Sequence, residues 1–254
     1  MKYTLITGAS SGIGKAFAQH YAQKDHNLVL IARSEDKLQL MKQELESKFR
    51  INVLPLAYDL SIPDIAQKIY TKLSDQNIEV ETLVNSAGIA TNGLVSDTSY
   101  ESQHNQIMLN IVALFDLTKL FLNSMIANNT GTVINVASTS AYHPIPTMAV
   151  YAASKAFVLS FSEALSTETE GTNVQIFAIS PGATDTNFFS NGGVSYGNLR
   201  TPEHVVDVTM SALNKKKISK IDGLNNYFTS MILPRILTRN RMVKIVYNIM
   251  MKQK

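Results

Sequence analysis

The sequence of 254 residues contains no cysteine and no tryptophan. The lack of cysteine excludes a disulfide scaffold, a thiolate metal site and a cysteine nucleophile, and it fits a reducing compartment. Glycine and proline are also scarce, with 12 and 7 residues, which excludes a collagen-like or low-complexity chain. Charged residues make up only 17% and hydrophobic residues 45%, so the chain can bury the core of one large domain or two small ones.

Long hydrophobic runs are absent as well. Glycine and serine interrupt the N-terminal apolar segment too early for a secretory signal. The most apolar helical stretch, 107–126, is broken by Asn110, Asp116 and Lys119. We therefore expect a cytoplasmic protein without a membrane span. The five histidines lie apart, at none of the spacings of a metal site, so no metal is predicted.

The net charge of +3 is unevenly distributed. Residues 224–254, here called the tail, carry six cations and no acid, which leaves residues 1–223 with 17 cations, 20 acids and a charge of −3. The tail is also rich in apolar residues, which predicts a basic amphipathic helix interrupted near Pro234. We expect it to pack on the catalytic domain, residues 1–223, or on a partner subunit. Contact with an anionic membrane or an acidic carrier is the less favoured alternative, and no nucleic-acid partner is expected.

Short apolar segments alternate with longer segments of helical period along most of the chain. Strands are predicted at 3–7, 27–32, 52–57, 82–85, 132–137 and 173–180, with a seventh near 218–221. Helices are predicted at 13–24, 35–49, 62–75, 100–128, 150–169 and 202–214. Because parallel strands need right-handed crossovers, this order predicts an α/β fold. We expect a Rossmann-type, doubly wound, mostly parallel sheet of about seven strands, with helices on both faces and a C-terminal helical extension.

The turn after the first strand is the first candidate site. It has the sequence Thr7-Gly8-Ala9-Ser10-Ser11-Gly12-Ile13-Gly14 and opens a predicted helix. Gly8 permits a tight turn, Gly12 lets the backbone approach a pyrophosphate, and Gly14 allows close packing of helix and sheet. The N–H groups of the helix N-terminus suit an anion, which predicts dinucleotide binding. An ordinary glycine-containing turn is the alternative.

The end of the second strand indicates which dinucleotide binds. An acid there accepts from the ribose 2′-hydroxyl, whereas an arginine accommodates a 2′-phosphate. This chain has Arg33 followed by Ser34 and no acid at the strand end, which predicts NADP(H). The alternative is that Arg33 pairs with Glu35 or with solvent.

A tyrosine and a lysine at the start of helix 150–169 form the second candidate site. Tyr151 and Lys155 are four residues apart and share one helix face. An adjacent ammonium stabilises phenolate and lowers the pKa of a phenol from about 10 towards neutral pH. In order and spacing, this pair and the other motifs resemble those of the short-chain dehydrogenases/reductases. The resemblance covers about residues 2–215, and the glycine spacing is similar to that of the family branch whose chains have about 250 residues. It rests on the motifs 7–14, Asn85-Ser86-Ala87-Gly88, Asn110, Ser138, 151–155 and Pro181-Gly182.

The resemblance implies an NADP(H)-dependent oxidoreductase that interconverts a ketone or aldehyde and its alcohol by hydride transfer. Tyr151 would be the general acid and base, Lys155 would lower its pKa and hold the nicotinamide ribose, and Ser138 would polarise the substrate oxygen. Asn110 would fix a water in a proton relay. Ser140 is a second candidate for the catalytic hydroxyl, but the 13-residue spacing to Tyr151 favours Ser138.

The cofactor contacts follow from the glycine turn and the resemblance. Asp59 and Leu60 would meet the adenine, the segment after the fourth strand would line the cofactor, and the segment after the sixth would contact the carboxamide. The full predicted set is Gly8, Ser10, Ser11, Gly12, Ile13, Gly14, Arg33, Ser34, Asp59, Leu60, Asn85, Ala87, Gly88, Lys155, Pro181, Gly182, Thr184 and Thr186.

Substrate contacts are predicted from Ser140, His143 and Phe188, in the segment 142–148 and in a flap at 188–199. Both segments are mostly apolar, so a small hydrophobic carbonyl compound or alcohol is favoured over a sugar; for His143, a loop position facing water is the stronger alternative. The resemblance also implies a homodimer or homotetramer formed through helices 100–128 and 150–169. The competing functions are a non-catalytic dinucleotide-binding redox sensor and a docking module built on the tail.

Overall fold

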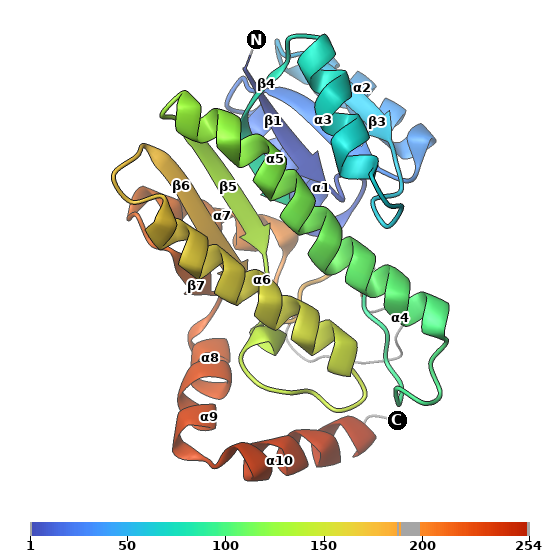
Figure 1. Ribbon diagram of the computed structural model, residues 1–254, viewed down its shortest axis with the longest axis vertical. Coiled ribbons are helices and arrows are strands. Elements are labelled where there is room, and N and C mark those ends of the chain that lie inside the picture. Colours follow the sequence, from blue (N-terminus) through green and yellow to red (C-terminus); the bar gives the residue numbers. More distant parts are fainter. Residues whose placement is uncertain (1, 187, 189–198, 253–254) are drawn as a thin grey trace.

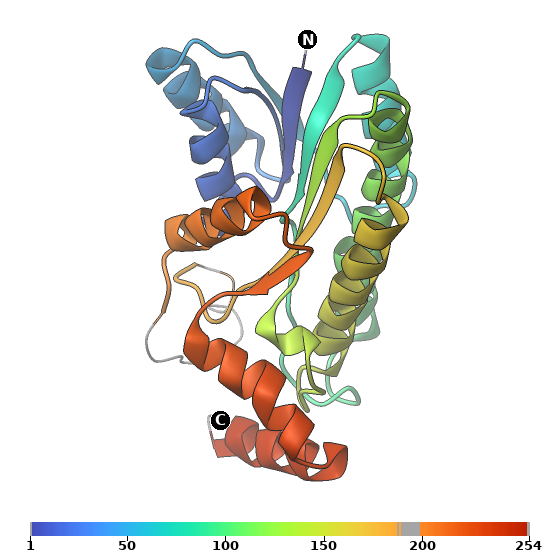
Figure 2. The same cartoon turned by 90° about the vertical axis from the view of Figure 1, so that its left-hand side faces the viewer.

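The computed structural model describes residues 2–186, 188 and 199–252. One seven-stranded sheet lies between two layers of helices (Figures 1 and 2). The strands are β1 (Lys2–Thr7), β2 (Asn27–Ala32), β3 (Val53–Ala57), β4 (Glu79–Asn85), β5 (Gly131–Val136), β6 (Val174–Ser180) and β7 (Ser219–Ile221).

The strand order is β3-β2-β1-β4-β5-β6-β7, and every pair of neighbours is parallel. In β1, Leu5 lies opposite Val29 of β2 and Leu83 of β4. The chain first winds outwards from β1 to β3 and then crosses to β4, so the winding direction reverses between β1 and β4. In doubly wound sheets such a reversal opens a crevice at the carboxyl ends of the strands. The predicted Rossmann-type sheet of seven strands is therefore confirmed.

Helices cover both faces of the sheet. Figure 2 shows α1, α2 and α7 on one side and α3, α5 and α6 on the other. The helices of residues 12–214 are α1 (Gly12–Ala22), α2 (Glu35–Lys48), α3 (Ile65–Asp75), α4 (Tyr100–Ile107), the π-helical η1 (Met108–Ala113), α5 (Leu114–Ala127), the short 3₁₀ turn η2 (Thr139–Ala141), α6 (Ala149–Glu168) and α7 (Pro202–Asn214). Fully buried Phe17 and Phe177 lie in the core on the first face, and Leu117 and Phe121 lie in the core on the second. Burial on both faces explains why the strands are almost continuously apolar.

Two helices differ from their predicted form for local reasons. The helix predicted over 62–75 begins only at Ile65, because Asp64 has a left-handed backbone with φ of 62°. The helix predicted over 100–128 is continuous from Tyr100 to Ala127, but it contains the wider turn η1. By length and composition this helix is apolar enough to cross a membrane, with a mean hydropathy of 1.4. It packs on β4 and β5, which makes it a core helix of the α/β domain.

The tail forms α8 (Leu224–Tyr227), the π-helical η3 (Phe228–Ile232), α9 (Leu233–Ile236) and α10 (Arg239–Lys252). The interruption predicted near Pro234 is confirmed, although the proline itself is not the point of the break. Pro234 stands in the first turn of α9, where a missing N–H is tolerated, and the helix breaks at Leu237, whose ψ is 147°. Figures 1 and 2 both show α10 at the lower end of the molecule.

Polar side chains buried between the sheet and α5 and α6 join these layers. The Asn85 amide donates to Thr118 Oγ1 at 3.0 Å and to Asn135 Oδ1 at 2.9 Å. The Asn135 amide donates to Ser162 Oγ at 2.9 Å. Because buried polar groups are costly without partners, this network fixes the register between strands and helices.

Replacing Asn135 should therefore destabilise the fold. Asn135→Ala removes a partner from both Asn85 and Ser162, and we expect the free energy of unfolding to fall by about 3 kcal/mol in urea titrations. The control is Asn128→Ala, which removes an exposed bond to Glu79 and should cost less than about 0.5 kcal/mol. Equal losses for the two variants would refute the structural role of the network.

Candidate active site

The turn between β1 and α1 depends on its glycines. Gly8 has φ of +66°, and a Cβ there would lie 2.9 Å from Cα of Ala87. A Cβ on Gly14 would meet the carbonyl oxygen of Gly8. The turn is thus held tightly against the segment that follows β4, as predicted for a loop that approaches a ligand closely.

The side chain of Thr7, a residue that was not among the predicted site residues, holds the turn in place. Its hydroxyl accepts from the backbone N–H groups of Ser86 and Ala87, both at 3.0 Å, and donates to the carbonyl oxygen of Val84 at 3.3 Å. A threonine at the end of a strand, directly before the glycines, was the only sequence signal. These bonds hold the end of β1 against the segment that follows β4.

A hollow of about 300 Å³ lies at the N-terminus of α1. It is lined by Ser11, Gly12 and Lys15 of the turn and helix, and by Asp185 and Thr186 from the segment after β6. Ser11 caps the helix without a side-chain bond, so the backbone N–H groups of its first turn can receive an anion. This donor set, with Lys15, fits a pyrophosphate.

Arg33 and Asp59 stand at the carboxyl ends of neighbouring strands β2 and β3. Asp59 Oδ1 accepts from the backbone N–H of Ser61 at 2.9 Å and from its hydroxyl at 2.7 Å. Burial acts to raise the pKa of Asp59, but these two bonds and the charge of Arg33 hold it below its usual value. Arg33 is exposed and forms no ion pair among the described residues, so the alternative in which it pairs with Glu35 is not observed. Its guanidinium is available to a phosphate.

Asn110 lies in the π-helical turn η1, a type of distortion often found at functional sites. Its Oδ1 accepts from the N–H of Ile89 at 3.0 Å, and its amide donates to the Ile89 carbonyl at 2.9 Å and to Ser154 Oγ at 3.1 Å. Ser154 in turn donates to the carbonyl oxygen of Tyr151 at 2.7 Å. Asn110 thus joins the loop after β4 to the first turns of α6.

Lys155 is the most deeply buried cation of the site, with 6% of its surface exposed. Its Nζ donates to the carbonyl oxygen of Val136 at 2.7 Å and lies 5.9 Å from the ring centroid of Tyr151. Burial lowers the pKa of Lys155 to about 8. A Cβ on Gly88 would lie 3.3 Å from Asn110 Oδ1 and 3.6 Å from Lys155 Nζ, so Gly88, Asn110 and Lys155 converge at one point.

Tyr151 lies beside this point, in contact with the predicted substrate residue Phe188. The Tyr151 ring is 4% exposed and packs against Phe188, with ring centroids 5.7 Å apart. Ser138 Oγ accepts from the N–H of Ser140 at 3.1 Å, which orients the Ser138 hydroxyl. His143 is partly buried, with a lowered pKa from burial, and its Nδ1 has no hydrogen-bond partner among the residues described. Most of the predicted flap, 189–198, lies outside the described residues.

The segment after β6 completes the site. The Pro181 carbonyl accepts from the N–H of Thr139 at 3.0 Å, and Thr184 Oγ1 donates to the Gly182 carbonyl at 3.1 Å. Gly182 faces Asn226 of α8, which the sequence did not single out, and a Cβ on Gly182 would meet the Asn226 amide.

The same segment is held farther along the chain. The N–H of Asp185 donates to the Arg200 carbonyl at 2.7 Å, and the Arg200 side chain approaches the buried carboxylate of Asp222 at 3.4 Å.

Some predicted residues point elsewhere. The Asn85 side chain lies in the buried network between sheet and helices, Leu60 lies in the apolar core, and Ile13 packs against the core on the opposite face. Ser10 is partly exposed at the turn and Ser34 is exposed at the start of α2. For these five residues, only the backbone or an exposed hydroxyl can face a ligand.

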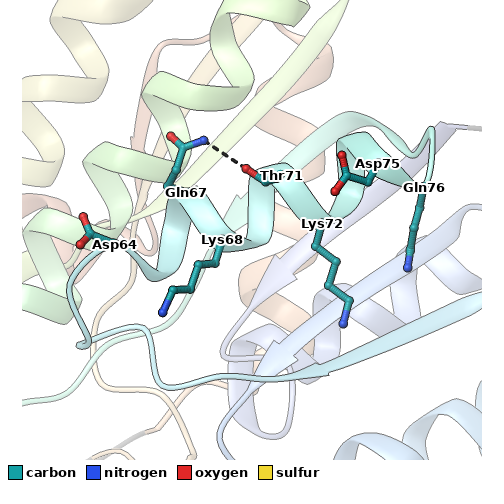
Figure 3. Close-up of a pocket in the computed structure, with 7 residues that line it drawn as sticks. All are labelled: Asp64, Gln67, Lys68, Thr71, Lys72, Asp75 and Gln76. Carbon is teal, nitrogen blue, oxygen red and sulfur yellow. Dashed lines mark hydrogen bonds between the residues drawn. The ribbon is translucent and has the colours of Figure 1, made fainter.

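A larger hollow, of about 640 Å³, lies along α3 and includes none of the predicted site residues. Figure 3 shows that its lining side chains come from α3 and its two ends, with Lys68 and Lys72 pointing to the same side. The hydrogen bond drawn in Figure 3 joins the Gln67 amide to the Thr71 hydroxyl within the helix, at 3.4 Å. The hollow is the exposed polar face of an amphipathic helix, not a second active site. Among the residues described, no group of His, Asp or Glu is arranged to hold a metal ion.

Comparison with known proteins places this geometry in context. A family model described as short chain dehydrogenase matches residues 2–193. A 7beta-hydroxysteroid dehydrogenase of Mediterraneibacter gnavus is 32% identical over 232 residues, which covers 89% of this chain and 87% of that protein. A solved short-chain dehydrogenase from Sphingobium yanoikuyae, in complex with NADPH, is 29% identical with a TM-score of 0.83 and covers 88% of this chain and 89% of its own. A bulky-bulky ketone specific alcohol dehydrogenase from Comamonas testosteroni is 25% identical with a TM-score of 0.80, covering 99% and 94%.

The buried lysine makes a testable contribution to stability. Because burial lowers the pKa of Lys155 from 10.5 to about 8, the unfolded chain binds one more proton than the folded chain between these values. The free energy of unfolding should therefore rise with pH in this window, by about 1 to 2 kcal/mol between pH 8 and 9.5. Urea titrations of the wild type and Lys155→Met would show this rise only in the wild type, and Lys15→Met should keep it. A parallel dependence in wild type and Lys155→Met would contradict the assignment.

Proposed function

Since the chain belongs to the short-chain dehydrogenase family of oxidoreductases, we propose that it uses NADP(H) to interconvert a hydrophobic ketone or aldehyde and its alcohol. The observation that carries this proposal is the convergence of Tyr151, Lys155, Asn110 and Gly88 at the carboxyl edge of the sheet. When bound, the cofactor supplies a hydride to the carbonyl carbon, so that carbonyl, NADPH and one proton give alcohol and NADP⁺.

The chain's own residues handle the proton. In reduction, the Tyr151 hydroxyl donates its proton to the carbonyl oxygen, and in oxidation it takes the proton back. The ammonium of Lys155 stabilises the negative charge left on the Tyr151 oxygen, and its bond to Val136 keeps it in place. Ser138, oriented by the N–H of Ser140, donates a hydrogen bond to the same substrate oxygen. Asn110 acts through position, because its bonds to Ile89 and Ser154 fix the surroundings of Lys155.

The choice of NADP(H) rests on the crevice between β1 and β4. The N-terminus of α1 and Lys15 would hold the pyrophosphate, and the exposed Arg33 at the end of β2 would hold the 2′-phosphate. The neighbour from Sphingobium yanoikuyae, which was solved with NADPH, supports this choice.

The proposed substrate is a hydrophobic carbonyl compound, and it is bulky instead of small as the sequence led us to expect. The packing of Phe188 against Tyr151 gives the reacting group an apolar neighbour. Two of the similar proteins have names that refer to a steroid and to bulky ketones. The alternative of a redox sensor without catalysis gains no support from the comparisons.

We assign the subunit contact to α5 and α6. Phe115 of α5 and Phe157 of α6 are 42% and 37% exposed, and both rings pack on Phe161 between them, with centroids 5.8 and 5.6 Å away. Exposed aromatic side chains that adjoin one another mark an interaction surface more often than single exposed ones do. A second copy of the chain would cover this aromatic patch.

Replacement of the proposed acid and base should abolish turnover without loss of binding. For Tyr151→Phe we expect NADPH-dependent reduction of a hydrophobic ketone panel to fall at least about 100-fold, since the proton donor is lost. The cofactor dissociation constant, read by NADPH fluorescence, should change less than about twofold because the phosphate contacts are intact. Tyr100→Phe, at a tyrosine 81% exposed, is the matched control and should keep full activity. Unchanged turnover in Tyr151→Phe would exclude the mechanism.

The cofactor choice has a separate test. Arg33→Ala removes charge-assisted bonds to the 2′-phosphate, so NADPH should bind about 10- to 100-fold more weakly and NADH almost as before. Arg50→Ala, at another exposed arginine, should change neither. Equal weakening of NADPH and NADH by Arg33→Ala would mean that Arg33 does not select the cofactor.

The subunit contact predicts a change in mass. Phe115→Glu and Phe157→Glu should each lower the native mass measured by light scattering, because a charge in an apolar contact is costly. Leu40→Glu, at an exposed leucine of α2, should leave the mass unchanged. A monomeric wild type, or variants with the wild-type mass, would contradict the assignment to α5 and α6.

A further inference from the structure

The tail concentrates exposed apolar side chains. Of the nineteen large hydrophobic residues that are exposed in the described chain, eight lie in the tail. They are Leu224, Tyr227, Phe228, Ile236, Ile245, Tyr247, Ile249 and Met251. A tail that packed only on its own domain would bury most of them.

Helix α10 is held to the protein chiefly along one line of side chains, with Val243 partly buried beside it. Met242 and Val246, one turn apart, are buried to 5% and 8% exposure. Ile245 and Ile249 form the adjacent line of the helix and remain 41% and 51% exposed. One side of α10 is thus used by the fold, and a second apolar side faces outwards.

Exposed cationic side chains lie next to the outward-facing isoleucines of α10. Arg241 lies one turn before Ile245 on the same side of α10, Lys244 lies on the neighbouring side, and both are exposed. Arg235, Arg239, Arg241 and Lys244 form no ion pair among the described residues, and residues 224–254 contain no acid. A symmetric contact between two tails would bring like charges together without a carboxylate between them. The partner that fits must be both anionic and able to accept apolar side chains.

The position of α10 suits a flat partner. In both views α10 is the lower end of the molecule, on the side towards which the strands point (Figures 1 and 2). An anionic bilayer is flat and carries phosphates over an apolar interior, which matches exposed isoleucines with cations beside them.

We propose that the tail docks the protein on anionic phospholipid membranes, with α10 in the plane of the headgroups. Ile245 and Ile249 enter the acyl boundary, and the cations of the tail meet the lipid phosphates. The line of Met242 and Val246 stays on the protein, so binding needs no unfolding of the tail. Docking is independent of the proposed function, because it depends on none of the residues of the active site.

Sedimentation of the full-length protein with lipid vesicles tests the proposal. The protein should bind vesicles of phosphatidylcholine mixed with phosphatidylglycerol, and bind phosphatidylcholine alone at least about tenfold more weakly. High salt should weaken the binding, because the cations act through screened charge. No sedimentation with the mixed vesicles at low salt would overturn the proposal.

Paired variants identify the surface. Ile245→Ser/Ile249→Ser and Arg241→Gln/Lys244→Gln should each weaken vesicle binding at least about tenfold. The matched controls are Leu40→Ser/Ile62→Ser, at exposed apolar residues of the domain, and Lys68→Gln/Lys72→Gln on α3 (Figure 3), which should bind as the wild type does. All variants should keep NADPH affinity, which reports an intact domain without requiring turnover.

Two results would refute this assignment. If the tail variants and the controls lose binding equally, the attraction is not specific to the tail. If the tail variants instead lower the native mass and leave vesicle binding unchanged, the exposed side of α10 is a contact with a second copy of the chain.

Discussion

The buried ammonium of Lys155 is the constraint around which the site is arranged. A charge taken out of water is costly unless it is hydrogen-bonded, and here the Val136 carbonyl at the end of β5 accepts from it. Gly88 is a glycine where a side chain would crowd both this ammonium and Asn110. The end of β5, the loop after β4 and the first turns of α6 are thereby held together. Tyr151 lies one turn before Lys155 on α6, so the same constraint places the proposed proton donor.

The reversal of winding between β1 and β4 joins this centre to the phosphate site. On one side, β1 to β3 present the glycine turn, Arg33 and Asp59. On the other, the segments after β4 to β6 and the start of α6 present the side chains proposed to react. The Thr7 hydroxyl fixes the distance between the two halves through its bonds to Ser86 and Ala87. One edge of the sheet can therefore both bind a long, charged cofactor and provide the groups for proton transfer.

The sequence was sufficient for features that repeat or follow local rules. The alternation of apolar segments predicted all seven strands, and the spacing of Tyr151 and Lys155 placed them on one buried helix face. Features that depend on tertiary contacts were missed. The inward turn of Asn85 depends on Asn135, fifty residues away along the chain. The left-handed Asp64 and the π-helical turn at Asn110 have no distinctive local sequence.

The proposed activity requires the glycine turn and the Tyr151–Lys155 pair to act together in hydride transfer to a carbonyl. The most direct measurement uses NADPH labelled with deuterium at the transferable position of the nicotinamide and follows a panel of hydrophobic ketones by mass spectrometry. We expect an alcohol product that carries one deuterium at the former carbonyl carbon. If the protein binds the labelled cofactor but yields no labelled alcohol from any ketone or aldehyde, the proposed activity is contradicted.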